Sequence, residues 1–179
     1  LIEKLLQCHG GIPAPLDEDA NGIHAYRIST ATIPKRHRGK GGSPLLVAPL
    51  QPGERFTLHY YHSVENAPIW EEHSLDRAGR IYIEEERYLK FGAGMGRMPG
   101  VGRMVQRGPY EAIENMHMPT GNFVLRIGSP GVDHTVIWRG REKNLSAVAS
   151  HEAVRFAARP VSLLYSLWRR VCPHPATPR

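Results

Sequence analysis

The feature that most constrains this chain is an alternation of apolar and polar residues in its central part. From Phe56 to Val64 every second side chain falls on one face, and the pattern resumes from Ile69 to Leu75. Alternation with a period of two is typical of strands with one buried face. Because only four residues separate the two runs, the sequence predicts an antiparallel hairpin over residues 56–75.

Five more short strands are predicted, each bounded by glycine, proline or other turn residues. They are residues 80–91, 110–118, 122–128, 132–139 and 151–158. With 18 glycines and 15 prolines, the chain carries too many turn residues for a helical bundle. About seven short strands therefore predict an all-β fold, an antiparallel β-sandwich or barrel.

The two ends of the chain differ from the predicted β domain, which covers residues 45–159. Residues 1–44 mix an apolar start with glycines, prolines and runs of acidic and basic residues, and we interpret them as an N-terminal extension or linker. After Pro160, apolar side chains recur at helical spacing. This pattern predicts an amphipathic C-terminal helix over residues 160–171, with a tail to residue 179.

The net charge of +6 is concentrated toward the C-terminus, where residues 126–179 hold nine Lys and Arg against three Asp and Glu. No stripe of basic residues interleaved with aromatic residues is present, as single-strand binding would favour, so we expect no nucleic-acid partner. No run approaches about 18 consecutive apolar residues, so no membrane-spanning helix is predicted. Cys8 and Cys172 lie outside any metal-ligand spacing and predict neither a zinc site nor a disulfide.

The predicted hairpin brings together the residues that could carry chemistry. If Val64 pairs with Ile69, the register places His62 opposite Glu71, with Glu65 at the mouth of the same turn. An imidazole beside a carboxylate is one way to build an anion site or a pH-sensitive contact. It is equally a pair that fixes the register of a hairpin, and both interpretations stay open at this point.

Metal binding is a sharper alternative for these residues. His62, Glu65, Glu71, His73 and His134 offer nitrogen and oxygen donors, but their spacing matches no familiar metal signature. The sequence therefore predicts no bound metal and no cofactor.

Two further patterns lack the features of catalytic motifs. Ser63 is next to His62, but neighbouring side chains of a strand point to opposite faces, and no nucleophile elbow is present. The glycine-rich run over residues 92–108, which contains Gly92 and Gly94, lacks the lysine of a phosphate-binding loop. We interpret it as a surface loop.

Three blocks of the sequence resemble the bacterial domain-of-unknown-function family numbered 1850. They are FTLHYYHSVENAPIWEE at residues 56–72, FGAGM at 91–95, and the GVDHTV and REKNLS segments within 131–146. The likeness covers about residues 45–158, and its most specific part is H-S-V-E followed six residues later by Glu. The resemblance implies that the signature positions are His62, Ser63, Glu65 and Glu71, and that the family's glycine loop includes Gly92 and Gly94.

The resemblance also implies a function. Members of that family look like small exported or membrane-tethered proteins, encoded beside or fused to the membrane component of tripartite ATP-independent periplasmic (TRAP) transporters of the TAXI class. It therefore implies a non-enzymatic accessory module, periplasmic or membrane-associated and facing the periplasm. Its partner would be the transporter permease or the solute-binding protein, with the signature residues as the contact or ligand site.

Two other classes of function stay open from the sequence. One is a metal- or acid/base-dependent enzyme that uses His62, Glu65 and Glu71, which requires a pocket and strongly perturbed pKa values. The other is a module that contacts a membrane surface through the C-terminal helix.

Overall fold

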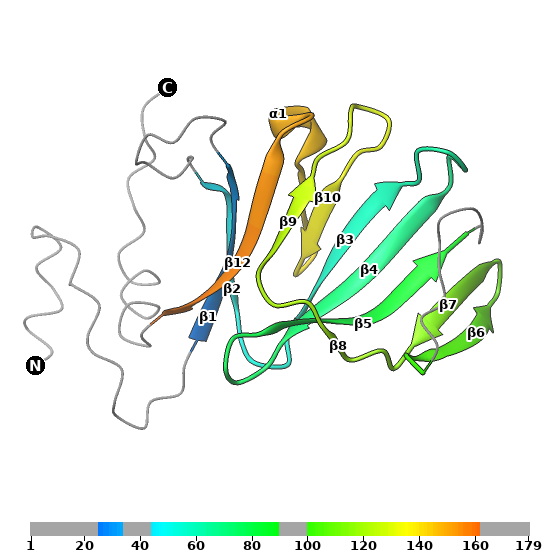
Figure 1. Ribbon diagram of the computed structural model, residues 1–179, viewed down its shortest axis with the longest axis horizontal. Helices are drawn as coiled ribbons and strands as arrows, with labels where there is room; N and C mark the ends of the chain where they lie inside the picture. The colour runs from blue at the N-terminus through cyan, green and yellow to red at the C-terminus, as the bar shows by residue number, and fades with distance from the viewer. Residues whose placement is uncertain (1–24, 34–43, 90–99, 162–179) are drawn as a thin grey trace, which may run out of the picture.

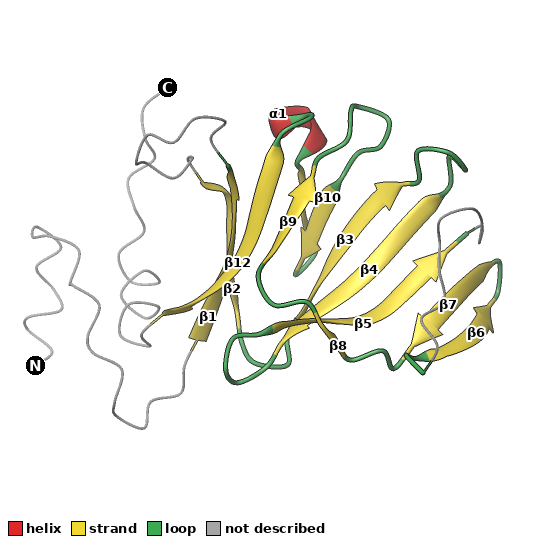
Figure 2. Cartoon of the chain, in the orientation of Figure 1, coloured by secondary structure: helices red, strands yellow, loops and turns green. Residues whose placement is uncertain are grey.

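The structure, a computed structural model, describes residues 25–33, 44–89 and 100–161. Within these ranges the chain forms two antiparallel β-sheets and one short helix (Figure 1, Figure 2). The prediction of a mainly β chain with antiparallel sheets is confirmed.

The strands divide into a small and a large sheet. The small sheet consists of β1 (Ala25–Thr32), β2 (Pro44–Leu50), β9 (Phe123–Arg126) and β12 (Ala153–Val161). The large sheet consists of β3 (Arg55–Tyr61), β4 (Pro68–Leu75), β5 (Ile81–Tyr88), β6 (Arg103–Arg107), β7 (Tyr110–Glu114), β8 (Met118–Pro119), β10 (Thr135–Trp138) and β11 (Arg141–Asn144). The helix α1 spans Ser146–Ala149.

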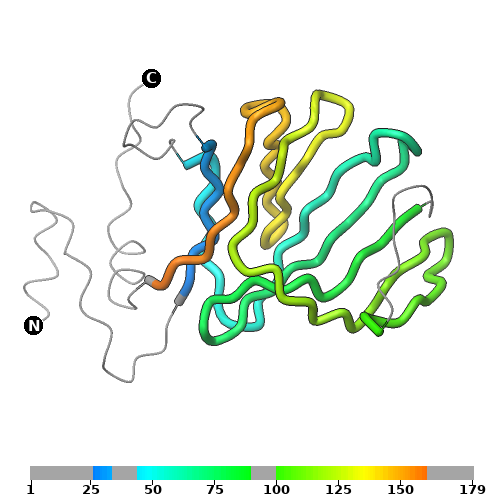
Figure 3. Tube along the Cα trace, in the orientation of Figure 1, coloured from blue at the N-terminus to red at the C-terminus, as the bar shows by residue number. Residues whose placement is uncertain are grey.

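The chain passes repeatedly between the two sheets, as the trace in Figure 3 shows. The small sheet has the order β2-β1-β12-β9, and the large sheet the order β11-β10-β3-β4-β5-β7-β6, with β8 also paired to β5. Consecutive strands β2 and β3 lie in different sheets, and so do β9 and β10. The small sheet therefore joins the start of the described chain to its end.

One hydrophobic core contains side chains of both sheets. The large sheet contributes Phe56 and Leu58 of β3, and the small sheet contributes Ile28 of β1 and Phe156 of β12; each is at most 2% exposed. Burying a side chain of this size stabilises the fold by about 1.5–3 kcal/mol. The alternate positions of β3 that the sequence placed on one face are thus the positions that hold the two sheets together.

A second, smaller apolar cluster lies farther along the large sheet. It is formed by Ile69 of β4, Tyr88 of β5 and Ile113 of β7. Tyr60 packs against both clusters. The region around Tyr60 is therefore the border between the core shared with the small sheet and the separate cluster of the large sheet.

The described residues hold twelve strands, where about seven were expected. The residues expected to form a linker contribute β1, whose inward positions are Tyr26, Ile28 and the polar Thr30, so its alternation is weak. The strand β11, with the sequence REKN, is a polar edge strand without an apolar face. Such strands are specified by pairing with their neighbours rather than by their own pattern.

The strand β2 was also not among the expected strands, and two further differences lie beside turns. β6 falls within the stretch read as a glycine-rich loop, and the single strand expected over residues 110–118 is divided into β7 and β8. Asn115 and His117 have φ angles of 59° and 39° between these two strands. This left-handed backbone interrupts a strand and is tolerated best by glycine and asparagine.

The helix expected from residue 160 is wrong at its start. Pro160 and Val161 complete β12 instead, and residues 162–179 lie outside the described residues, as do residues 1–24. Proline is tolerated here because β12 pairs with β9 only up to Phe156, so Pro160 has a neighbouring strand on one side alone. Among the described residues, no helix has the length and hydropathy to cross a membrane.

The predicted hairpin is present, but its expected register is wrong by four residues. β3 ends at Tyr61 and β4 begins at Pro68, so the connection has six residues and Leu58, not His62, lies opposite Glu71. A shift by an even number leaves every side chain on its expected face, and the alternation alone cannot detect it. The turn is set instead by Asn66, which adopts a φ of 47° just before the strand starts.

Candidate functional site

The six residues 62–67 that connect β3 to β4 form a loop that we call the hairpin tip. The N–H of His62 donates to the carbonyl of Ala67 at 2.8 Å, and the N–H of Asn66 donates to the carbonyl of His62 at 2.9 Å. The Nδ1 atom of His62 accepts a hydrogen bond from the N–H of Glu65 at 3.2 Å. His62 therefore holds the tip together through both its backbone and its side chain.

The tip presents its middle residues to solvent. Ser63 is exposed, and Val64 is 74% exposed, the highest value among the large apolar side chains described. Tyr61, at the end of β3, is 37% exposed beside it. Three of the expected site residues, His62, Ser63 and Glu65, are thus together in this loop.

The fourth expected residue, Glu71, lies apart from the tip. Its partner across the sheet is Leu58, four residues before His62 and therefore about 13 Å away along the strand. The expected pair of His62 and Glu71 is wrong, although both residues lie in the same hairpin. The inward face of β4 places Glu71 in a different polar cluster.

That cluster, which we call the Glu71 cluster, lies at the border between the two apolar clusters. Its members share the inward side of the large sheet and are Tyr60, Glu71, His73, Glu86, Tyr88 and His134. The hydroxyl of Tyr60 donates to Oε1 of Glu71 at 2.8 Å. The Nε2 atom of His73 lies 3.2 Å from the other carboxylate oxygen.

A second carboxylate faces this one from the neighbouring strand. Glu86 of β5 lies directly opposite Glu71 and accepts a hydrogen bond from the Tyr88 hydroxyl. Burial raises the pKa of Glu86 above its usual value and the charge of Glu71 raises it further, against the effect of the Tyr88 hydrogen bond. Burial and the same carboxylates also raise the pKa of Tyr60 and of Tyr88, so both hydroxyls stay donors.

His134 covers the cluster from the loop before β10. Its ring stacks on that of Tyr60 with centroids 4.9 Å apart, and its Nδ1 accepts a hydrogen bond from the N–H of Gly128 at 3.0 Å. Burial lowers the pKa of His134, partly offset by the charge of Glu71. The neutral ring therefore serves as an acceptor for a backbone group and as an apolar lid over Tyr60.

His73 connects the Glu71 cluster to the shared core. It is 1% exposed and stacks on Phe56 at 5.0 Å and on Phe123 at 5.5 Å. Phe123 in turn stacks on Phe156 at 4.7 Å, so a continuous row of rings runs from the large sheet into the small one. Among the described residues, Nδ1 of His73 has no hydrogen-bond partner.

These contacts define what the cluster can do. Two facing carboxylates, one with a raised pKa, can hold a proton between the strands and release it as the pH rises. The groove described below is lined by none of the six residues. We therefore interpret the Glu71 cluster as a partly buried polar network, which His73 connects to the core shared by the two sheets.

The remaining expected positions give no further site. Gly92 and Gly94 lie outside the described residues. In the part of the chain that the structure describes, no group of three or more His, Cys, Asp and Glu side chains has the geometry of a metal site.

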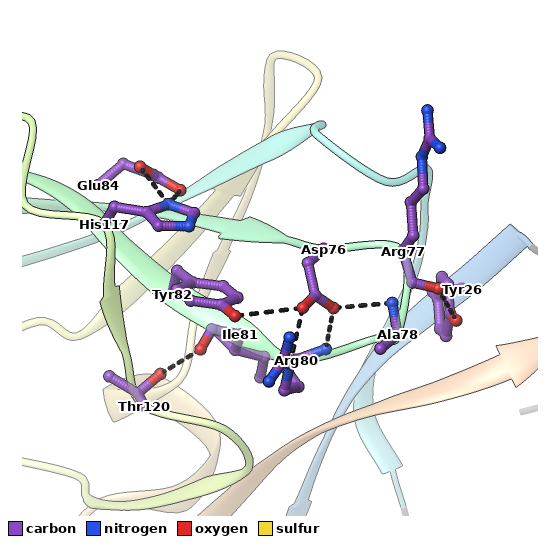
Figure 4. A network of polar contacts seen from close by, with 10 residues as sticks. All are labelled: Tyr26, Asp76, Arg77, Ala78, Arg80, Ile81, Tyr82, Glu84, His117 and Thr120. Atoms are coloured by element: carbon purple, nitrogen blue, oxygen red, sulfur yellow. Dashed lines mark hydrogen bonds and ion pairs between the residues drawn. The ribbon is translucent and has the colours of Figure 1, made fainter.

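An open groove of about 410 Å³ lies at the end of β4 opposite to the tip. It is lined by Pro52, Gly53, Arg55, Ser74, Leu75, Asp76, Arg77, Glu84 and His117. Glu84 accepts a hydrogen bond from the Ser74 hydroxyl at 2.5 Å. It accepts a second one from Nδ1 of His117 at 3.0 Å, which Figure 4 shows. Burial raises the pKa of Glu84, but these two donors outweigh it and the net pKa lies below the usual value.

The sequence offered a partial signal for the residues of the Glu71 cluster and none for His117 of the groove. Tyr60, Glu71 and His73 sit on one face of the alternating hairpin, so their proximity follows from the pattern once the register is known. His117 gave no signal, because it is a single histidine in an irregular segment that reaches Glu84 across 33 residues of chain. Contacts of that kind depend on sheet topology.

The comparison with known protein families gives one result. The family model described as Domain of unknown function (DUF1850) matches residues 56–145, about half of the chain. The matched stretch includes the hairpin tip, the Glu71 cluster and His117. No curated protein and no solved structure matches the chain.

Proposed function

We propose, because this chain belongs to the DUF1850 family, that it is a non-enzymatic accessory module of a TRAP-type transporter of the TAXI class. The module would act in the periplasm, or at the membrane on its periplasmic side. It would contact the transporter permease or the solute-binding protein. The transporter in this proposal comes from the family resemblance, and the contact surface comes from the geometry of the hairpin tip.

The single observation that supports a contact role is the combination of order and exposure in the tip. Its backbone is closed by two hydrogen bonds and its side-chain link from His62 to Glu65 adds a third. At the same time Val64 is 74% exposed. A loop that is already ordered loses little conformational entropy on binding, which favours association.

The composition of the tip suits a protein partner. An apolar side chain surrounded by polar ones resembles the centre and rim of a small interface, where the centre excludes water. Val64 supplies the centre, and Ser63 and Glu65 beside it supply polar groups. Tyr61, the last residue of β3 before the tip, is a further partly exposed aromatic side chain.

The competing enzyme hypothesis needs three residues in one place. An acid/base site built from His62, Glu65 and Glu71 requires the carboxylate of Glu71 near the imidazole. Glu71 instead bonds Tyr60 and His73, and Nδ1 of His62 is occupied by the N–H of Glu65. The geometry of the described residues therefore favours contact over turnover at this loop.

A capture experiment tests the proposal. The domain is immobilised and offered the cognate permease in detergent and the cognate solute-binding protein in separate arms. We expect one of the two to be retained, and Val64→Asp to lower its affinity about tenfold, because a charge is placed in the centre of the contact.

A matched control introduces the same negative charge at an exposed valine outside the tip. Val148 of α1 is 51% exposed, and Val148→Asp should bind like the parent. Capture of neither partner by the parent domain would contradict the proposed function. Equal binding by the two aspartate variants would contradict the role of the tip.

A further inference from the structure

One wall of the groove is the turn that follows β4, and this turn is rigid. Gly79, in the turn after β4, has a φ of 75°, and a Cβ atom there would lie 2.5 Å from the ring of Tyr26. The Tyr26 hydroxyl donates to the carbonyl of Arg77 at 2.6 Å. The turn that carries Asp76 and Arg77 is therefore fixed against the small sheet.

One of the two carboxylates in the groove is fully occupied. Oδ1 of Asp76 accepts the N–H groups of Ala78 and Arg80, both at 2.8 Å. Oδ2 accepts Nε of Arg80 at 2.7 Å and the hydroxyl of Tyr82 at 3.2 Å (Figure 4). These donors lower the pKa of Asp76 despite an opposing effect of burial, so the carboxylate stays ionised and is compensated within the turn.

The other carboxylate, Glu84, is occupied as well. Ser74 and His117 donate to it, and the positive charge of Arg55 also lowers its pKa. The carboxylates of the groove thus have donors of their own, and they do not fill the hydrogen-bonding capacity of the two arginines in the lining.

Arg55 and Arg77 remain as guanidinium groups on the groove. Among the described residues, the side chain of neither one has a hydrogen bond or an ion pair within 4 Å, and the bond from the Tyr26 hydroxyl reaches only the backbone carbonyl of Arg77. Figure 4 shows the side chain of Arg77 extending away from Asp76, whereas Arg80 points toward that carboxylate. A guanidinium group offers five N–H donors and matches carboxylate and phosphate oxygens.

His117 also lines this groove, and its ring is held in place by two neighbours. It stacks on Tyr82 with centroids 4.3 Å apart and an angle of 8° between the rings. Its Nδ1 is bound to Glu84, and the side chain is 68% exposed. Its φ of 39° is a left-handed backbone conformation, which histidine adopts more readily than most residues.

We propose that this groove binds the anionic oxygen group of a small molecule, a carboxylate or a phosphate, through Arg55, Arg77 and His117. A volume of about 410 Å³ lies within the range of small-molecule sites. The guanidinium groups supply the donors, and Nε2 of His117 is the ring atom left to reach the ligand. The site is separated from the hairpin tip by the length of β4, roughly 23 Å, so it acts independently of the proposed contact with a transporter.

The test titrates the whole chain with inorganic phosphate in one arm and acetate in another, with ionic strength held constant by chloride. Backbone and side-chain NMR signals of Arg55, Arg77 and His117 are followed. We expect saturable shifts at these residues with at least one probe, at millimolar concentrations typical of a single small anion. The arm that saturates identifies the oxygen group that the site prefers.

Variants connect the shifts to the groove. Arg55→Gln combined with Arg77→Gln should weaken binding at least about tenfold, since both guanidinium donors are lost. His117→Asn should weaken it about threefold while keeping the backbone, because asparagine tolerates a positive φ. Arg126→Gln removes one exposed charge from β9 and should change nothing.

Thermal melts check that each variant is folded, and we expect the arginine variants to melt close to the parent because, among the described residues, their side chains form no hydrogen bond and no ion pair within 4 Å. If neither probe gives saturable shifts at the groove, the proposal is wrong. It is also wrong if Arg126→Gln weakens binding as much as the paired arginine variant, because the effect is then that of net charge.

Discussion

The hydroxyl of Tyr60 donates a 2.8 Å hydrogen bond to the carboxylate of Glu71, a diagonal neighbour on the adjacent strand. This contact lies where the core shared by both sheets meets the second apolar cluster. It gives the signature carboxylate a structural partner inside the fold, whereas the other signature residues of the hairpin lie in the exposed tip. The two groups of signature residues can therefore be tested separately.

Tyr60→Phe tests the contribution of this bond to stability. Removing the donor while keeping the ring leaves a half-buried carboxylate with one partner fewer, and we expect the free energy of unfolding to fall by about 1–2 kcal/mol. Urea unfolding of both proteins measures the difference. Tyr61→Phe is the control, because the Tyr61 hydroxyl has no hydrogen-bond partner among the described residues and the side chain is 37% exposed. If both variants unfold alike, the bond contributes nothing beyond the ring.

His73→Ala tests the row of stacked rings between the sheets. The imidazole is 1% exposed between Phe56 and Phe123, so its removal leaves a cavity that costs about 2–4 kcal/mol. His73→Phe keeps a ring of similar size and loses only the contact with Glu71. We expect thermal denaturation to rank the parent as most stable, then His73→Phe, then His73→Ala. The reverse order of the two variants would mean that the polar contact, not the stack, dominates.

Glu86→Gln tests the pH dependence of the Glu71 cluster. Burial raises the pKa of Glu86 above its usual value, so the folded protein binds this proton more tightly than the unfolded chain. The free energy of unfolding should therefore fall as the pH rises from the unfolded pKa through the folded one. Glutamine cannot ionise, so the variant should lose this decrease and gain stability at neutral pH relative to the parent.

Urea unfolding at a series of pH values from about 4 to 8 measures this effect. The series begins near the usual pKa of glutamate and extends above it. Glu142→Gln, on the exposed edge strand β11, controls for the loss of one carboxyl group. A difference between parent and Glu86→Gln that does not change over this range contradicts a raised pKa for Glu86.

The sequence predicted the side of a strand on which each residue lies better than it predicted which residues pair across neighbouring strands. Alternation placed Phe56, Leu58 and Tyr60 on one side of a strand, and all three do point inward. It could not place Glu71, because a register shifted by four residues keeps the same faces and differs only in the turn. The loop geometry set by Asn66 decided between the two registers.

The alternation of apolar and polar residues could not predict contacts between distant parts of the chain. The pairing of β1 with β12 joins segments more than a hundred residues apart. The buried polar Thr30 also interrupts the apolar alternation from which β1 could have been predicted. His117 meets Glu84 for the same topological reason. Local sequence carries the period of a strand, whereas the neighbours of a strand are fixed by the packing of the whole fold.

The most direct test of the central claim is the affinity of the domain for its transporter partner when the hairpin tip is loosened. His62→Ala removes the acceptor of the Glu65 N–H, and His62→Asn restores one, since an asparagine oxygen can cap a nearby backbone N–H. With both variants shown to be folded by thermal melts, biolayer interferometry should give a dissociation constant about tenfold weaker for His62→Ala. The constant for His62→Asn should lie close to that of the parent. Parent-like binding by folded His62→Ala would contradict the claim that the ordered tip is the contact surface.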